Sequence, residues 1–253
     1  MKGRQNMKIY HGSDHIINKP MYGVGKEDND YGSGFYTTED TNKANEWAAL
    51  NGNDSAYTNK YEIDTNNLNI LNLDEYGPLS WIAEIISHRG CRGEAAQTLG
   101  NIIVDKYKVD TSNADIIIGY RADDSYIDIV DAFLRNQISL DEVDNLFRKG
   151  NLGKQVFIKS KKAFNSLEFK GYDIITNIQE FGKDEIQARI DVSRFLNNRE
   201  TQIMLNGYTP YGILARDTIN NNCIYDKEYK YTYVDESISN SINNDKDVDG
   251  YER

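Results

Sequence analysis

Short strand-like segments, each ended by glycine or polar residues, constrain the fold of this chain more than any other feature. Segments rich in aromatic and β-branched residues lie at 8–11, 34–38, 57–63, 68–73, 115–119, 155–158 and 167–175. Helical patterns separate some of these segments but not all of them. Because the two kinds of segment do not alternate strictly, the sequence predicts an α+β fold.

Capping residues and apolar periodicity predict where the helices begin. Thr41 is expected to be the N-cap of one helix, and Ser139 and Glu142 have the spacing of a capping box before another. The other helices are predicted after Pro78, over 95–107, after residue 124 and over 181–198. We therefore expect one domain at 7–175 with surrounding helices, and a helical C-terminal extension of unknown role at 176–230. The segment 231–253 is rich in Asp, Asn and Ser and is expected to be a disordered acidic tail.

Charge and hydropathy exclude several classes of protein. The chain has 29 basic and 40 acidic residues, a net charge of -11, which argues against a protein that coats nucleic acid through an extended basic surface. No apolar run approaches the roughly 20 residues that span a bilayer, and the polar N-terminus lacks the apolar core of a signal peptide. We therefore expect a cytoplasmic protein with no membrane partner. The two cysteines and three histidines have no zinc-site spacing, so no metal is expected.

Three segments place a polar side chain beside glycine in or next to a predicted strand. They are Tyr10-His-Gly-Ser13, Gly32-Ser-Gly-Phe-Tyr-Thr-Thr38 and Gly153-Lys-Gln-Val-Phe-Ile158. Glycine at such positions lets a ligand or a second backbone approach closely. Taken singly, each segment is more typical of a turn, a strand end or a surface residue than of a site.

Together and in this order, the segments resemble a bacterial family catalogued as a domain of unknown function, number three-nine-nine-zero, which is grouped with the ADP-ribosyltransferase clan. The resemblance extends over about residues 7–175 and includes three further motifs. These are Leu79-Ser-Trp-Ile82, Asp115-Ile-Ile-Ile-Gly-Tyr-Arg-Ala-Asp-Asp124, and Ala163 and Leu167 after Gln155-Val-Phe-Ile-Lys-Ser160. It implies a split-sheet domain that binds NAD as a substrate without a metal.

The resemblance also implies a role for individual residues. His11 matches the histidine that hydrogen-bonds a ribose hydroxyl, and Gly12 matches the glycine whose backbone holds the nicotinamide carboxamide. Tyr36 matches the tyrosine that stacks on nicotinamide. Gln155 stands at the position of the usual catalytic glutamate. By the same resemblance, the NAD-binding segments include Ser13 and Thr37.

Replacing the glutamate by Gln155 changes the expected chemistry. Cleavage of the nicotinamide–ribose bond develops positive charge on the ribose, which negative potential stabilises. The Gln155 amide oxygen can accept a hydrogen bond from a 2′-hydroxyl but carries no charge. The missing charge would come from Glu39, Asp40, Asp123 or Asp124, or from an acidic acceptor.

The expected function is transfer of ADP-ribose to a macromolecule, as a glycosyltransferase-class enzyme. The acceptor would be protein or nucleic acid, and the clan implies a toxin or defence protein with an antitoxin as a possible partner. One alternative is a non-catalytic nucleotide-binding or interaction module, and another is an NAD glycohydrolase. The basic run at 148–162 is interpreted as a solvated face in preference to a docking patch for an anionic target.

Overall fold

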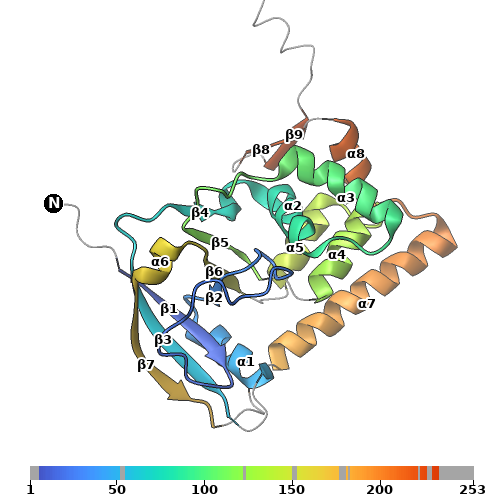
Figure 1. The fold of residues 1–253 in the computed structure, drawn as a ribbon. Helices are drawn as coiled ribbons and strands as arrows, with labels where there is room; N and C mark the ends of the chain where they lie inside the picture. Colours follow the sequence, from blue (N-terminus) through green and yellow to red (C-terminus); the bar gives the residue numbers. More distant parts are fainter. Residues whose placement is uncertain are drawn as a thin grey trace, which may run out of the picture.

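The computed structural model describes residues 6–51, 55–121, 124–149, 153–176, 181, 183–221, 223–226 and 230–233. These residues form two sheets, a short hairpin and eight α-helices (Figure 1). The α+β class predicted from the sequence is confirmed.

The strands fall into two separate sheets of different topology. The first sheet is antiparallel, with the order β1 (Asn6–Ser13), β3 (Tyr57–Asp64) and β7 (Leu167–Ile174). The second sheet has the order β2 (Phe35–Thr37), β6 (Lys154–Ile158), β5 (Ile116–Tyr120) and β4 (Ile70–Asn72), and its β4–β5 pair is parallel. A C-terminal hairpin pairs β8 (Cys223–Asp226) with β9 (Lys230–Tyr233).

Among the described residues, one isolated main-chain bridge joins the two sheets. The Tyr10 N–H donates to Thr38 O at 2.8 Å, and the Thr38 N–H donates to Tyr10 O at 2.9 Å. Since β2 also pairs with β6, the bridge places β1, β2 and β6 side by side. The three glycine-containing segments of the sequence therefore meet at this junction.

The helices lie mainly on one side of the second sheet (Figure 1). Their bounds are α1 (Thr41–Asn51), η1 (Leu73–Glu75, a 3-10 turn), α2 (Gly77–Arg89), α3 (Glu94–Tyr107), α4 (Asp124–Leu134), α5 (Leu140–Lys149), α6 (Lys161–Asn165), α7 (Lys183–Asn206) and α8 (Ala215–Asn220). Helices α1 and α6 are exceptions, since α1 packs against β1 and β3 of the first sheet and α6 packs on the opposite face of the second sheet.

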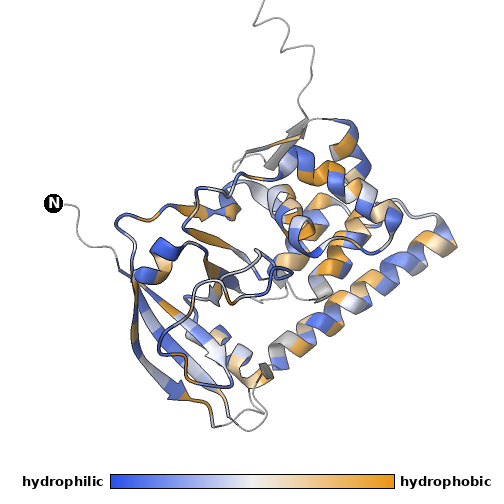
Figure 2. Ribbon diagram, viewed as in Figure 1, coloured by the Kyte–Doolittle hydropathy of each residue, from blue (hydrophilic) through white to orange (hydrophobic). Residues whose placement is uncertain are grey.

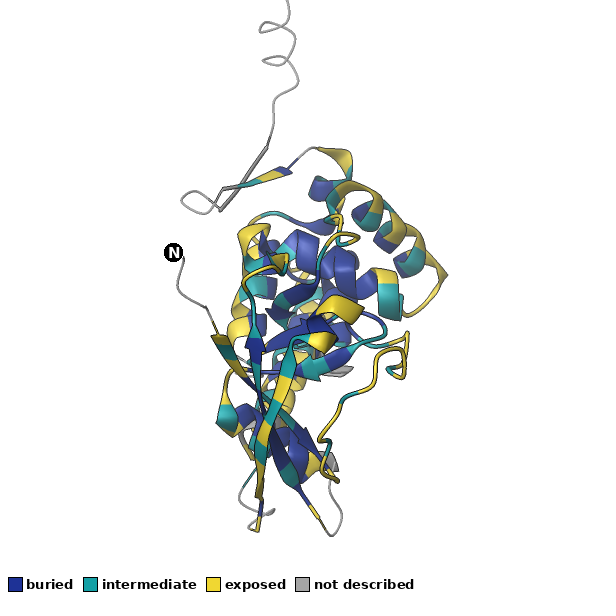
Figure 3. Cartoon of the chain, turned by 60° about the vertical axis from the view of Figure 1, so that its left-hand side comes forward, coloured by how far each residue is buried: buried dark blue, intermediate teal, exposed yellow. Residues whose placement is uncertain are grey.

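Two hydrophobic cores cover opposite faces of the second sheet. Strand alternation sends Phe157 into the larger core, with helices α2 to α5, and Val156 and Ile158 into a smaller core with Ile9 of β1. Burial on both faces explains why β5 and residues 156–158 of β6 are continuous runs without charged or amide side chains (Figure 2). By contrast, β7 at the edge of the first sheet is exposed or half-buried along its length (Figure 3).

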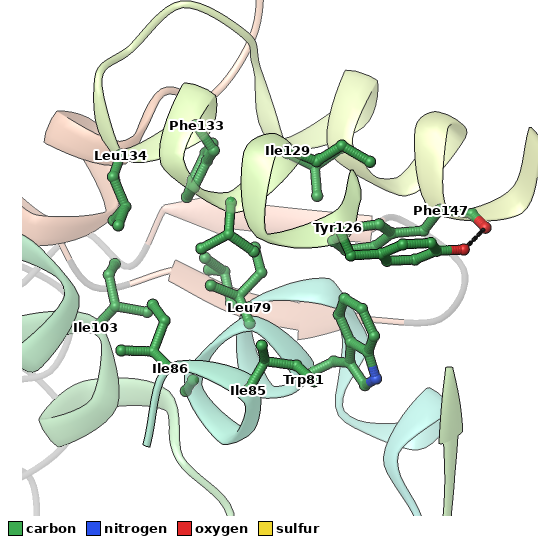
Figure 4. Close-up of a cluster of buried hydrophobic side chains, with 14 of the residues drawn as sticks. Leu79, Trp81, Ile85, Ile86, Ile103, Tyr126, Ile129, Phe133, Leu134 and Phe147 are labelled. Atoms are coloured by element: carbon green, nitrogen blue, oxygen red, sulfur yellow. Dashed lines mark hydrogen bonds between the residues drawn. The ribbon is translucent and has the colours of Figure 1, made fainter. Parts of the chain in front are cut away.

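Trp81, Tyr126 and Phe147 pack together at one side of the larger core, next to aliphatic side chains such as Leu79 (Figure 4). The rings of Tyr126 and Phe147 stack with centroids 5.0 Å apart, and the Tyr126 hydroxyl donates to Phe147 O at 2.8 Å. Trp81 packs edge-on against Phe147, with ring centroids 4.2 Å apart. The hydrogen bond from the Tyr126 hydroxyl satisfies the one polar side-chain group of the stacked pair, which burial would otherwise leave unpaired.

The C-terminal extension packs onto the same core as the preceding helices. Val192 of α7, Ala215 of α8 and Cys223 of β8 are all buried in the larger core. Arg199 of α7 also donates to Glu142 of α5 at 2.5 Å. The segment after residue 176 therefore completes the helical half of the molecule.

The observed element ends differ from the predicted ones at a few places. Asp40, not Thr41, caps α1: its carboxylate accepts the Asn42 N–H at 2.8 Å. The strand predicted at 8–11 does not end at residue 11, since Gly12 and Ser13 continue β1. The capping box is confirmed, since the Ser139 N–H donates to Glu142 at 2.9 Å and the Glu142 N–H donates to Ser139 Oγ at 3.4 Å.

Several short elements were not predicted from the sequence. Helices α6 and α8 and the β8–β9 hairpin are too short for a periodic pattern to stand out. Strand β9 includes the first three residues of the expected tail at 231–253, and residues 234–253 lie outside the described part of the chain.

None of the helices in the described ranges combines the length and the apolarity that a bilayer crossing requires. In the same ranges, no three His, Cys, Asp or Glu side chains gather closely enough to hold a metal ion.

Candidate functional site

His11 spans the gap where the two sheets separate. Its Nδ1 lies 2.6 Å from Tyr36 O, and its ring packs on Phe35 with centroids 4.6 Å apart. Because a carbonyl oxygen only accepts, Nδ1 must carry the proton, which leaves Nε2 as an acceptor. Burial lowers the pKa of His11 below its ordinary value of 6.5, although the hydrogen bond to Tyr36 opposes this. The neutral ring is therefore the form present at neutral pH.

Gly12 presents main-chain polar groups at this gap. The N–H and C=O of Tyr10 point toward β2, so strand alternation directs those of Gly12 to the same edge. If the register of the Tyr10–Thr38 bridge continued, Gly12 would pair with Tyr36. The pairing instead stops at the bridge, and Tyr36 O is bound by His11.

Helix α1 explains why the residue at this position is glycine. A Cβ on Gly12 would lie 2.5 Å from Ala48 N and still closer to Ala44 O, both main-chain atoms of α1. The close approach of helix and strand fixes the end of β1 and leaves no room for a side chain.

Tyr36 is half-buried and is held by its hydroxyl. The hydroxyl donates to Gly32 O at 2.7 Å and accepts the Tyr31 N–H at 3.0 Å. Its ring packs on Phe157 with centroids 4.8 Å apart. Burial raises the pKa of Tyr36 well above its ordinary value, so the hydroxyl stays protonated. The ring is thus a neutral, rigidly oriented aromatic surface.

Gln155 is buried and only partly satisfied. It is 5% exposed, and its Nε2 donates to Asp30 Oδ2 at 3.2 Å. Asp30 is also 5% exposed, and its Oδ1 accepts from Arg89 Nη1 at 2.9 Å. Gln155 Oε1 is buried with no hydrogen-bond partner among the described residues. Leaving such an acceptor unpaired typically costs about 1–3 kcal/mol, so this atom is the one most in need of a ligand donor.

The structure brings His11, Tyr36 and Gln155 onto three neighbouring strands. Tyr36 pairs with Phe157, two residues from Gln155, and strand alternation places Gln155 and Phe157 on one face. Tyr36 packs on Phe157, so it shares that face. His11 approaches from the first sheet and donates to the Tyr36 main chain, but its ring packs on Phe35, which strand alternation places on the opposite face of β2 from Tyr36 and Gln155.

Ser13 and Thr37, the other predicted NAD-binding residues, make hydrogen bonds inside the protein. Ser13 Oγ donates to His15 O at 2.5 Å and accepts from Asn59 Nδ2 at 3.0 Å. Thr37 is fully buried, and its hydroxyl donates to Val156 O at 2.6 Å. Both side chains hold the strands on either side of the gap.

The four acids predicted to supply the missing negative charge differ in exposure and in hydrogen bonding. Glu39 is exposed, and Asp40 is occupied as the cap of α1. Asp123 and the side chain of Asp124 lie outside the described residues.

Sequence reasoning missed Asp30, Arg89 and Glu84. Glu84 is 1% exposed and hydrogen-bonded to His88 Nε2 at 3.0 Å, and its negative charge contributes to the raised pKa of Tyr36. Asp30 lies in the glycine-containing loop before β2, where nothing local distinguishes it from a solvated residue. The hydrogen bond that links Asp30 to the site comes from Gln155, which is 125 residues away in sequence.

The basic run at 148–162 is dispersed over local partners rather than gathered at the gap. Its described bonds are Arg148 to Asp144, Lys154 to Asp74, Lys159 to Thr111 O, and Lys162 to Asn67 O and Asp115. These four charges are paired with acceptors in adjacent segments, which favours the interpretation as a solvated face.

A family model described as "Protein of unknown function (DUF3990)" matches residues 7–169. The chain belongs to this family. No curated protein and no solved structure matches the chain. The DUF3990 region includes β1, β2 and β6, and therefore every residue of the candidate site. It ends within β7, so α7 and α8 lie beyond it.

Proposed function

We propose that this chain has an ADP-ribosyltransferase-like fold, binds NAD at the junction of β1, β2 and β6, and transfers ADP-ribose to a macromolecular acceptor. The observation that carries the proposal is the interrupted pairing of β1 and β2. The His11 Nδ1–H donates to Tyr36 O in place of a main-chain partner, and the N–H and C=O of Gly12 are directed at the gap.

The chemistry of these groups suits the nicotinamide end of NAD. A carboxamide carries one acceptor and two donor hydrogens, so it complements a backbone N–H and C=O at Gly12. The held ring of Tyr36 offers a stacking surface for the pyridinium. Gln155 Oε1, on the face shared with Tyr36, is the proposed acceptor for one ribose hydroxyl. His11 Nε2, on the Phe35 side at the end of β1, is the proposed acceptor for another.

In the proposed reaction the bond between ribose C1′ and the nicotinamide nitrogen breaks. The bonding electron pair leaves with nicotinamide and neutralises its ring, while positive charge develops on the ribose. A nucleophilic atom of the acceptor then bonds to C1′ and loses its proton. Rigid placement of both leaving group and ribose is the main contribution of the residues named.

Labelled NAD distinguishes this proposal from its alternatives. The protein is incubated with NAD labelled on its adenylate and with bacterial lysate, and both nicotinamide and labelled macromolecules are measured. Label in protein or nucleic acid supports transfer, and free ADP-ribose alone indicates a glycohydrolase. NAD binding without nicotinamide release indicates the non-catalytic module that the neutral Gln155 also fits.

A matched pair of substitutions ties the result to the site. His11→Gln should lower nicotinamide release, whereas His15→Gln, the same change at an exposed position four residues later, should leave it unchanged. Equal rates in both variants would remove His11 from the proposed site. The toxin or defence setting, with an antitoxin as partner, belongs to the same proposal and is supported by the family resemblance alone.

A further inference from the structure

We infer that Asp30 is a positioning residue for Gln155: it turns the side-chain amide so that the oxygen, not the nitrogen, is presented to the ligand. The position would accordingly take a ligand hydroxyl that donates its hydrogen. The proposed function supplies the identity of that ligand, a ribose, but the polarity itself follows from the three side chains Arg89, Asp30 and Gln155.

The polarity follows from what each group can do. A guanidinium only donates and an ionised carboxylate only accepts. Arg89 Nη1 donates to Asp30 at 2.9 Å, so Asp30 keeps an acceptor oxygen for Gln155, 3.2 Å away. A carboxylate cannot donate to the amide oxygen, so the Gln155 nitrogen must face Asp30. Gln155 Oε1 is then the remaining polar atom, and it is buried without a partner among the described residues.

The loop that carries Asp30 is firmly anchored beside the site. The next residue, Tyr31, is 3% exposed, and its hydroxyl donates to Tyr120 O at 2.6 Å and accepts from Trp81 Nε1 at 2.9 Å. Its main-chain N–H donates to the Tyr36 hydroxyl at 3.0 Å. One turn of chain therefore fixes the position of the Asp30 carboxylate relative to both Tyr36 and Gln155.

Asp30→Asn tests the polarity with almost no change in shape. Arg89 still donates, so the oxygen of the new asparagine faces Arg89 and its amino group faces Gln155. Two amino groups cannot hydrogen-bond to each other, so the Gln155 amide rotates and presents its nitrogen to the ligand. A ribose hydroxyl would then accept rather than donate, which opposes positive charge on the ribose.

We expect Asp30→Asn to lower kcat for nicotinamide release by about 10- to 100-fold, with the Kd for NAD changed less than about threefold. The double variant Asp30→Asn with Gln155→Glu should recover kcat, because the introduced glutamate accepts from the new amino group and also presents an oxygen to the ligand. Asp28→Asn, the same change at an exposed position in the same loop, should behave as the parent. A double variant no faster than Asp30→Asn, with both folded, would overturn the inference.

A second measurement does not depend on NAD. In the NMR spectrum of the 15N-labelled protein, the side-chain amide of Gln155 is assigned by its loss in Gln155→Glu. Asp30→Asn should shift this signal and speed its exchange with water, while Asp28→Asn should not. An unmoved signal overturns the inference even if the parent cleaves NAD. A parent that neither binds nor cleaves NAD defeats the proposed function alone, because the NMR result still decides the role of Asp30.

The double variant also covers a failure of Asp30→Asn to fold. Restored folding in the double variant would support the amide–carboxylate pair, because the pair is rebuilt with its two members exchanged. Continued unfolding of the double variant would overturn it.

Discussion

The neutral form of His11 determines which atom it can offer to a ligand. Nδ1 is taken by Tyr36 O at 2.6 Å, so any added proton must go to Nε2, the acceptor assigned to the ribose. Burial disfavours that protonation by lowering the pKa of His11. The same burial makes the protein sensitive to acid, because the unfolded chain accepts the proton more readily than the folded one.

We expect the free energy of unfolding to decrease as the pH falls below about 6.5. The folded pKa of His11 lies below the ordinary value of 6.5, so between the two the unfolded state binds more protons and stability rises with pH. Urea unfolding at several pH values between 5 and 8 measures this slope. His11→Gln should reduce this slope, and identical slopes in the parent and His11→Gln would exclude His11 as its source.

The hydroxyl and the ring of Tyr36 should have separable roles. Tyr36→Phe keeps the ring but removes the hydrogen bonds to Gly32 O and from the Tyr31 N–H, so it should cost about 1–3 kcal/mol of stability. Tyr36→Leu also removes the stacking surface and should additionally weaken NAD binding by on the order of 1 kcal/mol. Urea unfolding and calorimetric titration with NAD measure the two effects. Equal NAD affinity in both folded variants would rule out stacking by this ring.

Helix α1 and strand β1 approach each other so closely that the strand needs glycine. Gly12→Ala would place a methyl group against main-chain atoms of Ala44 and Ala48, which cannot rotate away. We expect a loss of about 1–3 kcal/mol in the free energy of unfolding, and weaker NAD binding because the end of β1 is displaced. A folded variant with the stability of the parent would show that α1 moves freely and does not fix the site.

The strands were predictable because their signal is local. Aromatic and β-branched residues alternate with polar ones in β3 and form short apolar runs in β5 and β6, and the capping box of α5 is visible as two residues three positions apart. The first strand was predicted to end at residue 11 because the glycine that follows is typical of turns. Glycine is needed at position 12 because the main chain of α1, more than 30 residues away in sequence, packs against it.

The candidate site was predictable only as far as motifs extend. His11, Tyr36 and Gln155 each stand in a glycine-containing motif, and their strands are neighbours in the structure. Asp30 and Arg89 do not stand in a motif that the sequence analysis could identify. The hydrogen bonds that connect them to Gln155 depend on how the loop before β2 is held between α2 and β6, which is a property of tertiary packing.

The folded unit is larger than the family region. The DUF3990 match ends at residue 169, yet the larger core continues to Cys223. Beyond the buried apolar side chains, Ile213 O accepts the Leu140 N–H at 2.8 Å, and Thr218 O accepts from the Tyr107 hydroxyl at 2.9 Å. The extension therefore covers apolar side chains of the larger core, and it also pairs polar groups of α3 and α5 in hydrogen bonds.

We expect a chain that ends at Thr176 to be unable to fold stably, although it retains every residue of the candidate site. Burial of one large apolar side chain contributes roughly 1.5–3 kcal/mol, and the truncation removes Val192 and Leu214, both under 5% exposed, together with the Arg199 partner of Glu142. Losses of this size are comparable with the roughly 5–15 kcal/mol that stabilises a domain. Circular dichroism during thermal unfolding should show no cooperative transition for this chain, whereas a chain ending at Tyr233 should melt like the parent. Cooperative melting of the shorter chain would instead make the family region an autonomous domain, with α7 and α8 as a separable attachment.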